Sequence, residues 1–169
     1  MSIWLLVLRL VHVVAGVIWG GGALVMEFFI GRSIAGTGEA GQKFTQYLMG
    51  KMQFHKFMTA MAVSTVVAGG LLYWHDSDGF ASAWKFSGAG LGFGVGAVFG
   101  LIAFITGAIF GSSNAKLGQV SAQIQGKPTD EQLTQINALQ KQIKTVSPIH
   151  IYSMILTLVL MATARYFSF

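Results

Sequence analysis

The sequence predicts an all-α integral membrane protein: a four-helix bundle formed by a single transmembrane domain over residues 1–169. Hydrophobic residues make up 53% of the chain and charged residues only 10%, whereas a soluble domain carries about 25% charge. Mean hydropathy is +0.62. Four apolar stretches also approach or exceed the roughly 20 residues that a helix needs to cross the hydrocarbon. The lipid bilayer is therefore the first expected partner.

The predicted spans and the polar segments between them follow from this hydropathy. The spans cover residues 3–30, 57–74, 86–111 and 146–169. A polar connection that contains glycine follows the first span, over residues 32–51, and a short loop follows the second, over residues 75–85. In the third span one helical face is shared by four glycines, Gly88, Gly92, Gly96 and Gly100. Small residues at this spacing permit close helix packing. A nucleotide-binding glycine loop is not matched, because no strand precedes these residues.

Residues 112–145 predict a helical hairpin that extends the third and fourth spans beyond the membrane. An apolar stripe over 117–124 is broken at Gly126, and Thr129 to Gln132 form a capping box that opens the next helix. The apolar face of that helix comprises Leu133, Ile136, Leu139 (or Gln140) and Ile143. We expect the two stripes to form the seam of an antiparallel hairpin. The alternative is a docking surface for a partner protein.

The distribution of basic residues predicts the orientation in the membrane. Four spans place both termini on one side, where only Arg9, Lys85 and Arg165 lie. The other side carries Arg32, Lys43, Lys51, Lys56, Lys116, Lys127, Lys141 and Lys144. Under the positive-inside rule the connections are cytoplasmic. In a bacterium the termini are then periplasmic and the protein lies in the inner membrane. The basic residues form no stripe interleaved with aromatic residues, so nucleic acid is not an expected partner.

Ionisable residues inside the first span indicate a functional site. Arg9, His12 and Glu27 share one helical face with Trp19. Lipid cannot solvate such groups, so this face must turn toward protein, water or a cofactor. A simple structural role is the alternative, in which His12 bonds to a backbone carbonyl or to a threonine and Arg9 extends toward the headgroups.

Haem b is the first candidate cofactor. His55 opens the second span and His150 opens the fourth, so both are expected near the cytoplasmic edge, at the level of Glu27. Two histidines at equal depth on different helices can supply both axial nitrogens of a haem iron. Lys51, Lys56 and Lys144 are placed to pair with the propionates. Either histidine near the interface can instead simply reach headgroups or water.

A second haem and a bare metal ion are the other cofactor hypotheses. His12 can ligate a haem near the outer edge, with Met161 at matching depth and Arg9 close to the propionates. Imidazole and thioether ligands suit Cu(I), whereas two histidines with one carboxylate suit Fe(II) or Zn(II). The candidate metal ligands are His55, His150, His12 and Glu27. The chain has no cysteine, which excludes thiolate sites and iron–sulfur clusters.

The run from Leu10 to Gly21 resembles the first span of the CopD-like superfamily of bacterial membrane proteins, which includes copper-resistance CopD domains and HemJ-type protoporphyrinogen oxidases. The similar features are a Leu-His pair, a Trp seven residues after His12, at Trp19, and a Gly after it. Trp84-Lys85 is also similar to the Trp and Lys that open a HemJ-type helix. The HemJ resemblance implies a haem b ligand at His12 and a functional lysine at Lys85. The CopD resemblance implies copper handling.

The sequence therefore favours a membrane haem b or transition-metal binding protein in redox chemistry or metal handling. Whether it is an enzyme stays open, since no nucleophile–base pair or paired carboxylates appear. The rival hypothesis is a non-catalytic accessory subunit of a larger membrane complex. A transporter, including one for copper, is the third, although Pro148, the only proline in a span, lies near the edge rather than at the midplane. A redox partner and a homo-oligomer are both compatible with the chain.

Overall fold

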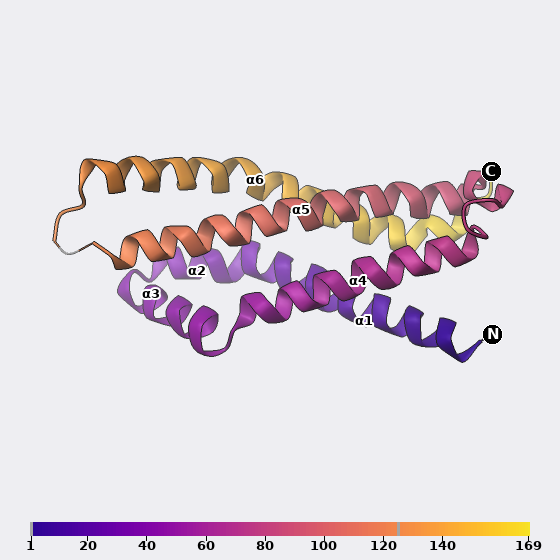
Figure 1. The fold of residues 1–169 in the computed structure, drawn as a ribbon, viewed down its shortest axis with the longest axis horizontal. Helices are drawn as coiled ribbons and strands as arrows, with labels where there is room; N and C mark the ends of the chain where they lie inside the picture. The colour runs from indigo at the N-terminus through magenta and orange to yellow at the C-terminus, as the bar shows by residue number, and fades with distance from the viewer. Residues whose placement is uncertain (1, 125) are drawn as a thin grey trace.

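The computed structural model describes residues 2–124 and 126–169, and this part of the chain is helical with no strand. The four principal helices run along the long axis of an elongated bundle (Figure 1). They are α1 (Ile3–Val25), α4 (Phe54–Asp76), α5 (Gly88–Ala122) and α6 (Asp130–Thr163). The N- and C-terminal ends of the chain lie at the same end of the bundle (Figure 1).

The bundle consists of two antiparallel helix pairs. α1 packs mainly on α4 and α5 mainly on α6, and the contacts between the pairs are far sparser than those within them. Figure 1 shows α5 and α6 side by side over nearly their whole length. The backbones of the two pairs therefore lie farther apart than those within a pair, and the side chains of Trp19, Ala62, Ala103 and Met154 form the core between them.

Glycine allows α5 and α6 to approach closely, as the sequence predicted. Gly88, Gly92, Gly96 and Gly100 are all buried. A Cβ atom added to Gly92 would lie 2.8 Å from Cβ of Ala164, and one added to Gly96 would lie 3.1 Å from Cβ of Leu160. Contacts this short leave no room for a side chain on this face, so the glycine series sets the spacing of the pair.

Beyond the apolar part, α5 and α6 stay in contact toward the turn that joins them. Ser113 Oγ donates a hydrogen bond to Gln142 Oε1 at 3.0 Å, and Val120 and Leu139 are buried. The predicted capping box is confirmed. Gln132 N–H donates to Thr129 Oγ1 at 3.2 Å, and Thr129 N–H donates to Gln132 Oε1 at 2.9 Å. These two bonds satisfy amide groups that would otherwise be unpaired at the start of α6.

The connection over residues 32–51 is helical, although the sequence indicated only a polar segment. The first helix continues through a π-helical turn, η1 (Met26–Ile30), into α2 (Gly31–Gly36). A turn at Gly38, whose φ is +56°, then reverses the chain into α3 (Glu39–Gln46) and a second π turn, η2 (Tyr47–Lys51). Glycine adopts this φ without steric penalty. The added Cβ of Gly41 would collide with the Ile34 carbonyl, so α3 lies directly against α2.

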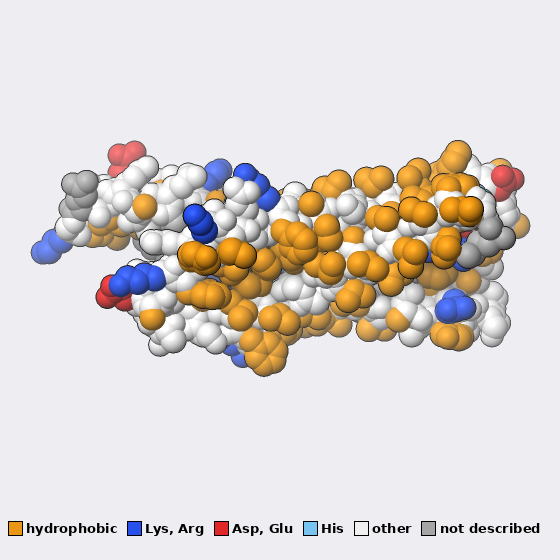
Figure 2. Space-filling view, turned by 90° about the horizontal axis from the view of Figure 1, so that it is seen from below, with side chains coloured by type: hydrophobic (Ala, Val, Ile, Leu, Met, Phe, Trp, Pro, Cys, Tyr) orange, Lys and Arg blue, Asp and Glu red, His pale blue; other side chains and the backbone are white. Residues whose placement is uncertain are grey.

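The outer surface of the bundle is apolar. Figure 2 shows hydrophobic side chains along most of the visible face and charged side chains gathered toward its ends. Ile3 is 81% exposed, Val17 64% and Ile105 57%. Four helices are long and apolar enough to cross a membrane, and at most 22% of each apolar window is buried inside the protein. Apolar helices that face outward in this way are those of a multi-pass membrane protein.

Candidate intramembrane histidine sites

His12 lies on α1 and contacts α4. Its Nδ1 is 2.8 Å from the carbonyl oxygen of Thr65. A Cβ added to Gly69, one turn after Thr65, would lie 2.5 Å from Cε1 of His12. The imidazole therefore occupies the space that a side chain at Gly69 would fill. The hydroxyl of Thr65 is buried and is the one buried side-chain polar atom without a hydrogen-bond partner among the described residues.

His150 repeats this arrangement between α6 and α5. Its Nδ1 is 2.8 Å from the carbonyl oxygen of Ala103, and a Cβ added to Gly107 would lie 2.8 Å from its Cε1. Gly107 follows Ala103 by one turn, as Gly69 follows Thr65. His150 is only 7% exposed, and its ring stacks with that of Phe110 at 6.4 Å and an interplanar angle of 12°.

The hydrogen bond fixes the tautomer of each ring. A carbonyl oxygen only accepts, so Nδ1 must carry the proton that it donates. Nε2 then holds the lone pair in the neutral imidazole, and it is the nitrogen able to bind a metal. Histidines that ligate metals usually donate their other N–H to a carboxylate or backbone carbonyl in this way. The bond of His12 to the Thr65 carbonyl is the contact that the sequence offered as its structural alternative. The same bond leaves Nε2 of both rings as the nitrogen that a metal or haem would use.

The contacts between helices give the relative levels of the histidines along the bundle. Ser147 Oγ donates to Glu27 Oε1 at 3.0 Å, which sets these two residues at one level. At 1.5 Å per residue, His150 then lies about 18 Å from His12 along the bundle, because Glu27 is fifteen residues beyond His12 and His150 three beyond Ser147. The His12–Thr65 bond places His55 about 15 Å from His12. His55 and His150 therefore lie within a few ångströms of the same level.

His55 has a more open environment than the other two. It is exposed on the surface of α4, beside Lys56, Thr59, Ala60, Val63 and Ser64. His55 lies two turns before the buried residue Ala62, on the same face of α4. Farther along α4, the Thr65 carbonyl contacts His12 of α1. The structure brings His55 to the level of His150 on the neighbouring pair, and ligation of one iron by both stays a prediction.

Glu27 is half-buried in the π-helical turn η1. Such turns are uncommon and occur often at functional sites. Its hydrogen bond with Ser147 joins α6 to the first helix, across the boundary between the two pairs. Sequence reasoning singled out Glu27 but missed Ser147, because serine in an apolar helix carries no signal of its own partner.

The interior beside His150 is filled by aromatic and thioether side chains. Trp19 is 7% exposed and meets the Phe104 ring edge-to-face at 6.3 Å. Met154, one turn from His150, is 1% exposed. Met58 and Met61 of α4 pack against this cluster. Trp19 thus lies in the core where the two pairs meet.

The remaining predicted site residues lie toward the end of the bundle that holds the termini. Met161 is half-buried and packs against Gly96, with its Cε 3.2 Å from an added Cβ there. It lies eleven residues beyond His150, which brings it within about 2 Å of the level of His12. Arg9 is exposed, one turn before His12. Lys85 is half-buried and donates from Nζ to the Phe80 carbonyl.

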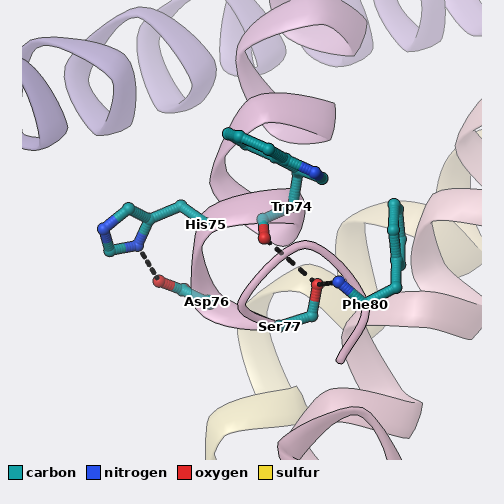
Figure 3. Close-up of polar contacts among 5 residues, drawn as sticks. All are labelled: Trp74, His75, Asp76, Ser77 and Phe80. Carbon is teal, nitrogen blue, oxygen red and sulfur yellow. Dashed lines mark hydrogen bonds and ion pairs between the residues drawn. The ribbon is translucent and has the colours of Figure 1, made fainter. Parts of the chain in front are cut away.

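The remaining histidine, His75, lies in the last turn of α4 and not in the predicted loop, and its side chain is away from the core. His75 Nδ1 lies 3.2 Å from Asp76 Oδ1, and its side chain is 43% exposed. Ser77 Oγ donates to the Trp74 carbonyl at 3.2 Å and accepts from Phe80 N–H at 3.1 Å (Figure 3). These bonds of Ser77 hold the turn that follows α4, and none of them involves the His75 side chain. Within residues 2–124 and 126–169, no group of three His, Asp or Glu side chains is close enough to hold a metal ion.

Comparisons with protein-family models, with curated proteins and with solved structures find no match to the chain.

Proposed function

We propose that the chain is an integral membrane protein that binds haem b within the bundle and takes part in electron transfer. One observation carries the proposal: His12 and His150 are held by the same arrangement, in which Nδ1 donates to a helix carbonyl one turn before a glycine. This leaves Nε2 of each ring as the ligating nitrogen. In this proposal His12 and His150 belong to two separate haem centres, because they lie about 18 Å apart along the bundle.

Haem at the level of His150 would draw on His150 and His55, which come from the two different helix pairs. The core where these pairs meet is filled by side chains, Trp19 among them, so haem binding requires the pairs to separate there. Lys144 is the cation assigned to the propionates. Bound haem supplies a one-electron couple whose potential depends on its axial ligands and on burial. His12 and Met161 are the corresponding donors at the other level, with Arg9 one turn away.

Copper is the second candidate, and a specific observation favours it. Met58, Met61 and Met154 gather in the core within reach of the His150 level, and thioether with imidazole suits Cu(I). Methionine is also an ordinary filler of apolar interiors. The sequence resemblance to both CopD-like and HemJ-type proteins, through His12, Trp19 and Lys85, is compatible with either cofactor.

The orientation belongs to the same proposal. Arg32, Lys43, Lys51, Lys56 and the four lysines of residues 112–145 are assigned to the cytoplasm, and both termini to the periplasm of a bacterium. The extension of α5 and α6 then projects into the cytoplasm, where an electron donor or the rest of a larger complex would dock.

An absorption spectrum of the detergent-purified protein, with elemental analysis of the same sample, tests the proposal. Haem gives a Soret band whose His150-level component is lost on His150→Ala substitution and kept in His75→Ala. Copper without iron and without a Soret band would select the second candidate. Neither metal in protein purified from cells supplied with both would support the accessory-subunit hypothesis.

A further inference from the structure

The surface of α3 presents aromatic and basic side chains away from the protein. Ala40, Phe44, Tyr47 and Lys51 share one helical face that continues from α3 into η2. Phe44 is 47% exposed and Tyr47 59%. The adjoining face packs inward, because Gly41 is buried against α2. Phe44 and Tyr47 therefore have no covering element in the described chain.

Other aromatic residues in the neighbouring segments are also exposed. Phe28 and Phe29 of η1 are 41% and 67% exposed, and Phe57 of α4 is 48% exposed. A helix with aromatic residues and lysine on its outer face is typical of segments that lie in the membrane interface.

The charged residues near these aromatic side chains indicate that the partner of this surface is anionic. Arg32, Lys51 and Lys56 are exposed, and the Arg32 guanidinium lies over the Phe28 ring at 5.8 Å. Lys43 is paired with Glu39 at 2.8 Å, which partly neutralises it. The net charge of this surface is positive. Each cation near an anionic leaflet strengthens binding roughly fivefold, about 1 kcal/mol.

We infer that the face formed by Phe44, Tyr47 and Lys51 lies in the headgroup region and binds anionic phospholipid, with Arg32 and Lys56 beside it. The aromatic rings enter the boundary of the hydrocarbon, and the cations pair with lipid phosphates. The inference does not depend on a bound cofactor. It assigns a function to the connection between the first two spans.

Spin labelling tests the placement, because the chain has no cysteine and single-cysteine variants need no background changes. Tyr47→Cys and Gln42→Cys are matched: both positions are exposed and lie on opposite faces of the helix. In vesicles of phosphatidylcholine and phosphatidylglycerol, a nitroxide at position 47 should be reached by oxygen and shielded from a water-soluble relaxant. The label at position 42 should show the reverse. Equal aqueous access at both positions would overturn the inference, and spin–spin coupling at position 47 would replace lipid with a second copy of the chain.

Lipid selectivity tests the charge component. Native mass spectrometry of protein with phosphatidylglycerol should show binding weakened about fivefold by Lys51→Gln. Lys127→Gln, at the far turn between α5 and α6, should leave it unchanged. Equal effects of the two substitutions, or equal binding of phosphatidylcholine and phosphatidylglycerol by the unaltered protein, would overturn the anionic specificity. Because these measurements need no haem, their failure is distinguishable from failure of the cofactor proposal.

Discussion

Gly107→Ala tests the fit between α5 and the imidazole of His150. The added methyl group would lie 2.8 Å from Cε1 and 3.1 Å from Nδ1 of the ring. Because the ring stacks with Phe110 and is buried, it cannot move without disturbing the interior. The substitution should therefore break the hydrogen bond from Nδ1 to the Ala103 carbonyl and separate α5 from α6 locally.

The expected magnitude follows from three contributions. Overpacking a filled interior costs about 1–3 kcal/mol, and loss of one hydrogen bond costs about 1 kcal/mol. Replacing a helical glycine by alanine returns about 1 kcal/mol. The net loss in the free energy of unfolding should be about 2 kcal/mol. Gly111→Ala is the matched control, since a Cβ at Gly111 meets nothing within 4 Å, and that variant should gain about 1 kcal/mol.

Unfolding by SDS in mixed micelles, followed by circular dichroism, measures both variants. The account predicts a difference of about 3 kcal/mol between Gly107→Ala and Gly111→Ala. Equal stability of the two would refute the reasoning, because it would show that the His150 ring does not occupy the space beside Gly107.

Three further predictions concern the packing of the bundle and the start of α6. Gly92→Ala should destabilise the protein by about 1 kcal/mol in the same assay, because its Cβ would lie 2.8 Å from Cβ of Ala164 and the overpacking exceeds the gain from replacing a helical glycine; stability equal to or above that of the unaltered protein would contradict this. Ser147→Ala should cost about 1 kcal/mol, since the half-buried Glu27 carboxylate loses its donor, and an unchanged unfolding curve would show that the bond contributes nothing. Thr129→Ala should cost about 1 kcal/mol of local stability, seen as faster amide hydrogen exchange over the first turn of α6; exchange at the original rate would argue against the capping box.

The helical architecture was predictable because hydropathy alone determines which segments can enter lipid. The glycine face of α5 and the capping box at Thr129 were also predictable, since both depend on residues close together in the sequence. The helical course of residues 32–51 was not, because it depends on the packing of Gly41 against α2. The π-helical turn at Glu27 likewise has no recognisable sequence pattern.

The candidate site was predictable in its residues but not in its contacts. Histidine within an apolar stretch singles out His12 and His150 without knowledge of the fold. Their partners, the carbonyls of Thr65 and Ala103, could not be predicted, because every helical residue has a carbonyl and the choice depends on helix register. Gly69 and Gly107 could be recognised as sites of close approach only once the opposing helix was known.

Titration of cofactor-free protein with haemin in detergent, followed through the Soret band, tests the central claim most directly. The account predicts saturable binding with the spectrum of axial imidazole ligation, and loss of the His150-level component in both His150→Ala and His55→Ala. Saturation that is unchanged in these variants, or absorbance that only follows free haemin in micelles, would contradict it.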